Sequence, residues 1–405
     1  MPMNLKIAIL GFGREGKSIL NFLKKTPPFQ KTSITVLDIE RDPRYLQKLK
    51  QFDLIFRSPG VPYNLPVIQT AIKSGVAVAS ATKLFFDLCP GTIIGITGTK
   101  GKGTTSTLLY QILRHSGKKV VLAGNIGTPM LDVLPKIDKK TLVILELSSF
   151  QLQDLKKSPP IAVIVDIFPD HLDVHKNMKE YLEAKANIAR HQTKNDVVFY
   201  FKANRLSKKM ALLSPGRKIP VAAPDDLSKN FIMAAMIARH LGCLETRIQT
   251  ALKSFSGLSY RLERVRILES TAFYNDSAST NPQTTAMAIR TLAKEKAPII
   301  LIAGGKDKNL NYAPLAKTIK NTRLISAVII FGENRDKIKR AVGGAASVLI
   351  SKNLQSAINL AWTHTRKYPK AVVLFSPGAA SFDMFKDYQD RGAQFTKIVK
   401  SLKSK

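Results

Sequence analysis

Two glycine-rich turns suggest phosphate binding, and the stronger one runs from Gly98 to Thr105 after the apolar run 92–97. Successive glycine N–H groups form a nest for an anion, and the N-terminus of a following helix adds positive potential. A lysine in such a turn reaches the outer phosphates of a nucleoside triphosphate. The expected phosphate-binding residues are Gly98, Thr99, Lys100, Gly101, Lys102, Gly103, Thr104 and Thr105.

Acidic residues follow two apolar runs and suggest a metal site. Glu146 directly follows the run 142–145, and Asp170-His-Leu-Asp173 comes shortly after the run 161–165. A carboxylate at the carboxyl end of a central strand, next to a phosphate loop, is well placed to hold Mg²⁺. The hydroxyl groups of Thr104 and Thr105 are further oxygen atoms that would be available to Mg²⁺.

The other turn lies near the N-terminus. Gly11, Gly13 and Gly16 have the spacing of a dinucleotide-binding fingerprint, and acidic Asp38 follows about twenty residues later. On its own this motif indicates NAD or another nucleotide diphosphate.

Short aliphatic runs alternate with amphipathic stretches, which is typical of parallel α/β architecture. We expect helices from Lys17, over 105–115 and over 230–241, and three α/β units. The expected domains are 1–91, 92–258 and 259–405.

Composition and charge narrow the classes of protein to which this chain could belong. The 405 residues carry a net charge of +34, yet lysines are spread along the chain and no RNA-binding signature concentrates them. Two cysteines are too few for a disulfide framework. No apolar run is long enough to span a membrane, and the N-terminus does not read as a signal peptide, so we expect a cytoplasmic protein.

These motifs together resemble the Mur ligase family over nearly the whole chain. Thr97-Gly-Thr-Lys-Gly-Lys102 is similar to the TGTNGK of that family, and 170–173 to its DHLD. Four further segments resemble the members that add D-glutamate, namely 58–61, 124–127, 145–151 and 376–383.

The resemblance implies an α/β fold of three domains: N-terminal Rossmann-like, central P-loop ATPase-like with a mostly parallel sheet, and C-terminal Rossmann-like. The implied activity is ATP-dependent addition of D-glutamate to UDP-N-acetylmuramoyl-L-alanine through an acyl phosphate, in peptidoglycan precursor synthesis. The implied cofactors are ATP and two Mg²⁺ ions. We expect a monomer that binds no nucleic acid and does not insert into a membrane.

The resemblance also assigns roles to residues. The implied catalytic residues are Lys102, Glu146, His171 and Lys185, with Thr104, Glu146, His171 and a carbamylated Lys185 at the metal. Gly11, Gly13, Asp38, Ser58 and Asn125 are expected to bind the UDP substrate, which reassigns the first glycine motif away from NAD. Asn230, Arg261 and Asp276 are expected to contact the base and ribose of ATP. Thr280, Lys308, Ser381 and Tyr388 are expected to bind the incoming amino acid.

Three departures from the family pattern bear on substrate choice. Gly103 replaces a hydroxyl residue of the phosphate loop, Ala278 replaces a lysine, and Lys229 with Met233 replaces two polar residues of the adenine motif. The alternatives are another peptidoglycan ligase, a folylpolyglutamate-like ligase, and a basic nucleic-acid-binding protein. An NAD oxidoreductase is disfavoured because no hydride-transfer site follows Gly16.

Overall fold

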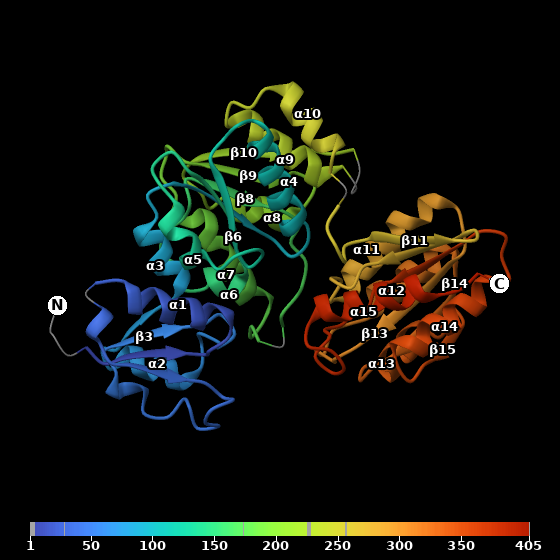
Figure 1. Cartoon of the computed structure of the whole chain (residues 1–405), viewed down its shortest axis with the longest axis horizontal. Helices are drawn as coiled ribbons and strands as arrows, with labels where there is room; N and C mark the ends of the chain where they lie inside the picture. Colours follow the sequence, from blue (N-terminus) through green and yellow to red (C-terminus); the bar gives the residue numbers. More distant parts are fainter. Residues whose placement is uncertain (1–4, 28, 173, 225–227, 256, 405) are drawn as a thin grey trace. The chain divides into compact units, whose positions relative to one another are not determined.

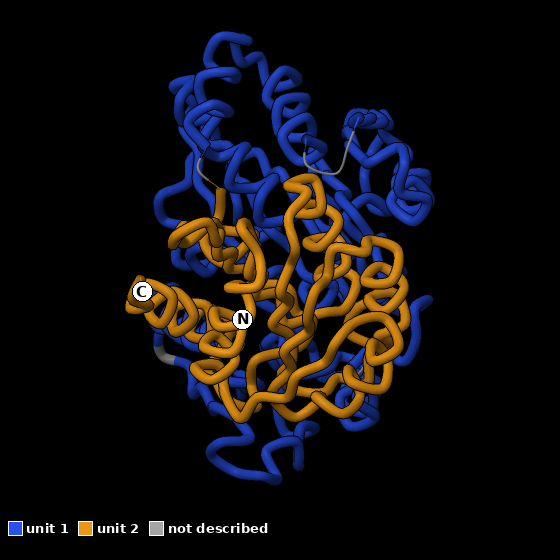
Figure 2. The backbone as a smooth tube through the Cα atoms, turned by 90° about the vertical axis from the view of Figure 1, so that its right-hand side faces the viewer, with its two compact units in different colours: residues 1–169, 174–255 blue, residues 170–173, 256–405 orange. Residues whose placement is uncertain are grey.

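The computed structural model describes residues 5–27, 29–172, 174–224, 228–255 and 257–404. Its chain forms two compact units, one of residues 1–169 and 174–255 and the other of residues 170–173 and 256–405 (Figure 2). Three sheets with mostly parallel strands confirm the expected α/β class. The division into three domains stays a prediction.

The first sheet, in the first unit, is parallel throughout. Its order is β2 (Ile34–Leu37), β1 (Ile7–Leu10), β3 (Leu54–Arg57) and β4 (Ala77–Ala79). The connecting helices are α1 (Arg14–Lys25), α2 (Pro66–Lys73) and α3 (Ala81–Leu88). The carboxyl ends of β1 and β3 therefore bring the first glycine turn and Ser58 to one edge.

The second sheet, also in the first unit, carries the stronger phosphate loop. Its strands, in order, are β10 (Arg217–Val221), β9 (Val197–Phe201), β8 (Ile161–Ile164), β5 (Thr92–Thr97), β7 (Leu142–Glu146) and β6 (Val120–Gly124). The helices around it are α4 (Lys102–His115), α5 (Met130–Val133), α6 (Ser149–Leu152), α7 (Met178–Arg190), α8 (Arg205–Ala211), α9 (Lys229–His240) and α10 (Glu245–Lys253) (Figure 1).

The third sheet forms the core of the second unit. Its strands, in order, are β11 (Glu263–Leu268), β12 (Thr271–Asn275), β16 (Ala371–Phe375), β13 (Ile299–Gly304), β14 (Ile325–Phe331) and β15 (Val348–Ile350). Only the β11–β12 pair is antiparallel among the strand pairs of the described residues. The helices are α11 (Pro282–Leu292), α12 (Ala313–Thr322), α13 (Arg335–Val342), α14 (Leu354–Thr365) and α15 (Tyr388–Ser401).

Two helices begin three residues earlier than the sequence predicted. Helix α1 starts at Arg14 rather than Lys17, and α4 starts at Lys102 rather than Thr105. In each case a glycine is the N-cap residue, and Gly101 has φ +94°, a conformation that glycine adopts without a Cβ penalty. The early start makes Lys102 the first residue of its helix, at the positive end of the helix dipole.

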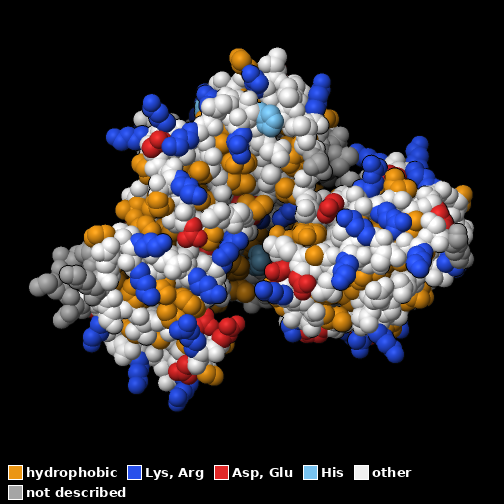
Figure 3. All heavy atoms as spheres, in the orientation of Figure 1, with side chains coloured by type: hydrophobic (Ala, Val, Ile, Leu, Met, Phe, Trp, Pro, Cys, Tyr) orange, Lys and Arg blue, Asp and Glu red, His pale blue; other side chains and the backbone are white. Residues whose placement is uncertain are grey.

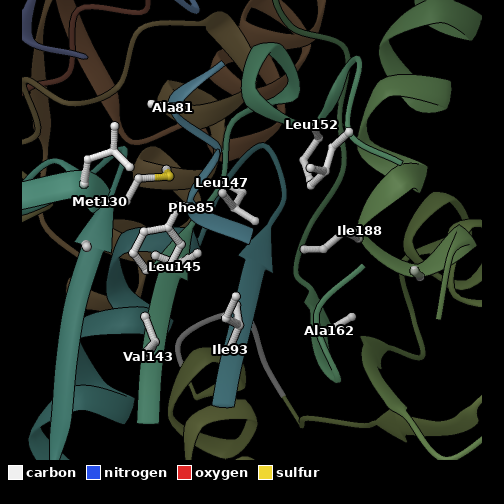
Figure 4. Close-up of a cluster of buried hydrophobic side chains, with 14 of the residues drawn as sticks. Ala81, Phe85, Ile93, Met130, Val143, Leu145, Leu147, Leu152, Ala162 and Ile188 are labelled. Carbon is white, nitrogen blue, oxygen red and sulfur yellow. The ribbon is translucent and has the colours of Figure 1, made fainter. Parts of the chain in front are cut away.

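One continuous hydrophobic cluster joins the first two sheets inside the first unit. Phe85 of α3 packs with Ile93 of β5, and with Val143 and Leu145 of β7 (Figure 4). Ile7 and Phe56 of the first sheet belong to the same cluster. Burying each such side chain contributes about 1.5–3 kcal/mol to folding, so the two sheets are held as one packed body.

Two features are relevant to the partners expected from the sequence, namely the distribution of basic side chains on the surface and the character of the helices. In the view of Figure 3, Lys and Arg side chains are scattered over the face rather than gathered in a stripe. Among the described residues, no helix has both the length and the apolar character that crossing a membrane demands.

Candidate active site

The phosphate loop between β5 and α4 depends on glycines at close approaches. A Cβ on Gly98 would lie 2.3 Å from Val165 Cγ2 and 3.0 Å from Asp166 O, and one on Gly101 would lie 2.5 Å from Asn230 Oδ1. Both glycines have positive φ. The loop is therefore specified by its glycines, and it leads directly into the N-terminus of α4, whose first N–H groups and dipole favour an anion.

Lys102 turns back over this loop. Its Nζ donates to Gly98 O at 2.8 Å and to Thr99 O at 3.1 Å. A half-buried ammonium group lies over the turn, at the positive end of α4. This arrangement favours an anion such as a triphosphate.

Asn230 from α9 lies against the same loop, as expected for an ATP contact, although its base contact stays a prediction. Thr105 Oγ1 donates to Asn230 Oδ1 at 3.3 Å, and Thr105 is fully buried. Thr104 is only half-buried. Of the two threonines, Thr104 is therefore the better candidate for a metal contact.

Glu146, at the carboxyl end of β7, carries the clearest metal-ligand signal. Its side chain is 2% exposed, Oε1 accepts from Asn125 Nδ2 at 2.9 Å, and Oε2 is buried with no hydrogen-bond partner among the described residues. A buried carboxylate oxygen without a partner is costly. A divalent cation held by this oxygen and by phosphate oxygens would remove that cost, so these residues fit Mg²⁺.

Asn125 is held against Glu146 by the backbone as well. Asn125 N donates to Glu146 O at 2.9 Å, and a Cβ on Gly124 would lie 2.4 Å from that same oxygen. Gly124 has φ +104° and no side chain, so it allows the ends of β6 and β7 to approach each other closely. The structure thus joins a residue expected at the UDP substrate to one expected at the metal.

Lys185 of α7 is buried beside the phosphate loop. Its Nζ donates to Gly98 O at 3.0 Å and to Thr97 Oγ1 at 3.4 Å, and it lies 4.9 Å from the ring centroid of Tyr181. The Tyr181 hydroxyl is 2.7 Å from Thr99 Oγ1. Lys185 is therefore part of the loop's surroundings and not the surface lysine that its sequence suggests, while its carbamylation stays a prediction.

His171 belongs by its contacts to the second unit, together with the rest of 170–173. It has φ +54°, its N–H donates to Asp170 Oδ1 at 3.0 Å, and its Nε2 lies 3.6 Å from Asp170 Oδ2. Asp173 lies outside the described residues. Within the part of the chain that the structure describes, no three His, Cys, Asp or Glu side chains gather as a metal site. The role of His171 at the metal stays a prediction.

The first glycine turn is closed by two side chains. Ser58 Oγ donates to Gly11 O at 2.7 Å, and Asp38 Oδ2 accepts from Phe12 N at 2.5 Å. Hydrogen bonds from the backbone N–H groups of Glu40 and Phe12 hold the pKa of Asp38 below its ordinary value. Asp38 and Ser58 therefore shape this turn, and their contacts with a UDP substrate stay predictions.

In the second unit, Asp276 joins several loops. Its Oδ1 accepts from Leu262 N at 3.1 Å, and its Oδ2 accepts from Ser279 Oγ at 2.5 Å and Ser376 Oγ at 2.7 Å. Arg261 precedes Leu262 and is half-buried. The structure therefore brings Asp276 close to the backbone next to Arg261, and the ATP contacts of both residues stay predictions.

Three of the residues expected to bind the amino acid lie on loops that follow strands of this unit, and the fourth, Tyr388, is the first residue of α15. Ser381 is buried, whereas Thr280, Lys308 and Tyr388 are half-buried. Ser277 Oγ donates to Tyr388 O at 2.9 Å, so the loop that carries Thr280 contacts the start of α15.

Sequence reasoning missed Arg391, which holds these loops together. Its guanidinium group donates to Ser277 O at 2.9 Å, Ala380 O at 3.0 Å and Ala379 O at 3.1 Å, and its side chain is fully buried. Burial lowers its pKa to about 10. A lone arginine in an amphipathic stretch gives no sequence signal, because only folding brings the loops to it.

The departures at the adenine motif have structural explanations. Met233 is fully buried in the core between α9 and α4, so it offers nothing to a base. Lys229 forms an ion pair with Asp166, and its Nζ lies 5.6 Å from the Phe201 ring centroid. These two positions serve packing and charge pairing in this chain.

Comparison with known proteins identifies the family of this chain. The sequence model described as the Mur ligase middle domain matches residues 96–262. The UDP-N-acetylmuramoylalanine–D-glutamate ligase of Acetivibrio thermocellus is 34% identical over 99% of this chain and 97% of its own length. The ligase of the same name from Clostridium acetobutylicum is 32% identical with the same coverage.

A solved structure shares the fold. The MurF ligase of Thermotoga maritima in complex with ADP has a TM-score of 0.62 and 15% identity, and the match covers 97% of this chain and 95% of that one. At 15% identity this structure shows only that the fold is shared. The family is shown by the relatives that are 32–34% identical over nearly the whole chain. The chain belongs to the Mur ligase family and is an ATP-dependent amide-bond-forming ligase.

Proposed function

We propose that this enzyme adds D-glutamate to UDP-N-acetylmuramoyl-L-alanine, in the cytoplasm, during peptidoglycan precursor synthesis. The observation that carries the proposal is the similarity, at 32–34% identity over almost the full length, to two ligases named for that reaction. The two glycine turns support it, because the reaction needs one site for a UDP group and another for a triphosphate.

The reaction needs activation, because a carboxylate is a poor electrophile. In the proposed sequence, an oxygen of the L-alanine carboxylate attacks the γ-phosphorus of ATP, the bond to the β–γ bridging oxygen breaks, and ADP leaves. The amine of glutamate then attacks the acyl carbon and loses a proton, and the C–O bond to phosphate breaks. An acyl phosphate is thus formed and consumed.

In this proposal the residues of the first unit position the phosphates and offset their charge. Lys102 would move from Gly98 O and Thr99 O to the transferred phosphoryl group. Glu146 Oε2 and Thr104 would hold Mg²⁺, which neutralises phosphate charge when it is bound. Positioning and charge neutralisation together account for most of the catalysis in phosphoryl transfer.

A second Mg²⁺ would involve His171 and a carbamylated Lys185. The burial of Lys185 next to Thr97 and Gly98 supports this role, because a carbamate there would supply an anionic oxygen close to the phosphate loop. Intact-mass measurement with and without bicarbonate tests it, and a mass that never includes CO₂ would contradict it.

In the second unit, Thr280, Lys308, Ser381 and Tyr388 would bind glutamate. Lys308 can pair with one carboxylate of the amino acid. Ala278 supplies no cation at its position, so Lys308 would carry more of the recognition.

The test is to incubate the enzyme with UDP-N-acetylmuramoyl-L-alanine, ATP and Mg²⁺ against a panel of amino acids. We expect phosphate release and a product of matching mass with D-glutamate. Turnover with L-lysine, or with a folate in place of the UDP substrate, would refute the substrate assignment and favour another ligase of the family. Lys102→Ala should abolish ADP release together with amide formation.

A further inference from the structure

A short segment directly after Glu146 links the two sheets of the first unit. It comprises Ser148 to Asp154, contains α6, and is closed by a capping box in which Ser148 and Gln151 bond reciprocally. Only Leu147 separates it from Glu146, the last residue of β7. The segment therefore begins next to the carboxylate proposed to hold Mg²⁺, while Glu146 itself is held in β7.

Arg57, the last residue of β3, grips this segment from the first sheet. Its guanidinium donates to Phe150 O at 3.0 Å and to Asp154 Oδ1 at 3.1 Å. The same group donates to Val61 O at 2.8 Å, on the loop that follows Ser58. One side chain thus joins the loop beside the first glycine turn to the segment after Glu146.

The pair formed by Arg57 and Asp154 is fully buried. Each side chain is 1% exposed, and Lys83 Nζ reaches Asp154 Oδ2 at 3.0 Å from the other side. Arg57 Nε has no hydrogen-bond partner among the described residues. A buried ion pair contributes little net stability compared with apolar residues of the same volume. The planar guanidinium group of Arg57 does, however, impose a defined geometry on the acceptors that it binds.

A second contact supports the same link. Gln151 Nε2 donates to Glu15 Oε1 at 2.6 Å, and Glu15 lies in the first glycine motif. Arg14 also donates to Gly124 O at 3.1 Å, next to Asn125. Both loops of the proposed UDP site are therefore tied to residues that adjoin Glu146.

We propose that Arg57 is a positioning residue that fixes the UDP-binding loops relative to Glu146 and the phosphate loop. This inference rests on the proposed function, since it assumes that the UDP substrate binds at the first glycine turn. Arg57 does not touch the reacting atoms. It fixes the distance between the L-alanine carboxylate and the γ-phosphate that this carboxylate attacks. A misplacement of reacting groups by about 1 Å can lower the rate by about 100-fold.

The test compares Arg57→Met with the double variant Arg57→Met/Asp154→Leu. The single variant leaves Asp154 buried without its guanidinium, so both its Tm and its catalysis should fall. The double variant removes both buried charges, so its Tm should recover toward wild type. We expect it to keep at least about a tenfold rise in KM for UDP-N-acetylmuramoyl-L-alanine or a matching fall in kcat, equivalent to about 1.4 kcal/mol.

Two measurements separate positioning from general damage. Affinity for ATP with Mg²⁺, measured by calorimetry, should stay within about twofold of wild type in the double variant. Asp87→Asn is the matched control, because Asp87 of α3 forms an exposed ion pair with Lys157 beyond α6. It should change neither KM nor kcat.

The inference is overturned if the stable double variant has wild-type KM and kcat, or if its ATP affinity falls in parallel with its activity. Failure of the proposed function would look different, because the wild-type enzyme itself would then not turn over this UDP substrate. In that case calorimetry with UDP as the probe still tests the link, and equal UDP affinity in the wild type and the double variant would overturn it.

Discussion

Replacing Gly16 by alanine should break the first glycine turn, whereas replacing Gly13 in the same motif should not. A Cβ on Gly16 would lie 2.2 Å from Gly11 O, 3.2 Å from Gly11 C and 3.2 Å from Ser58 Oγ. A Cβ on Gly13 would meet nothing within 4 Å, and Gly13 has an ordinary φ of −68°.

The size of the effect follows from the atoms involved. Gly11 O belongs to the backbone, so the turn and the start of α1 must move apart by roughly 1 Å for the new methyl group to fit. Overpacking of this kind costs about 1–3 kcal/mol. In a unit of this size each kcal/mol lowers Tm by about 2–4 °C, so Gly16→Ala should lower Tm by about 2–12 °C.

Differential scanning calorimetry of the two variants measures this shift, and KM for the UDP substrate reports the turn's proposed function. Gly16→Ala should lower Tm and raise KM, while Gly13→Ala should leave Tm unchanged. Equal Tm values for Gly16→Ala and wild type would refute the packing argument. A fall of the same size for Gly13→Ala would refute it as well.

Three further predictions concern single side chains. Glu146→Gln keeps an oxygen for Asn125 but removes the charge, so Mg²⁺-dependent ATP turnover should fall by more than about 100-fold, as measured by ADP release. Arg391→Lys leaves buried carbonyl oxygens unpaired at about 1–3 kcal/mol each, so thermal unfolding should begin earlier and KM for the amino acid should rise. Burial raises the pKa of Glu15 above 4.5, despite the hydrogen bond from Gln151. Its stability contribution is therefore present below pH 4.5 and lost as pH rises through the raised pKa, so Tm of wild type relative to Glu15→Gln should fall as pH rises above 4.5.

Much of the site could be predicted because its signals are local in sequence. Gly98 and Gly101 lie in one short glycine-rich turn, where both adopt positive φ, and Glu146 ends an apolar strand whose character is evident from its residues. Parallel α/β topology then brings the ends of β5 and β7 together. The sequence resemblance supplied the family, and the full-length relatives agree with it.

The first residues of two helices were predicted less accurately from the sequence. The predicted beginnings at Lys17 and Thr105 missed the first turn of each helix, because glycine as an N-cap has no side chain that marks a helix start. This matters for function, since the early start of α4 places Lys102 on the first turn.

By itself the sequence determined the α/β class, the positions of both glycine-rich turns and the family, since each depends on short-range periodicity or on residues a few positions apart. Only the tertiary structure revealed that Arg57 meets Asp154 and that Arg391 joins the loops of the second unit. These partners are far apart along the chain, and an arginine becomes a defined clamp only when burial removes water and leaves carbonyl and carboxylate oxygens as its acceptors.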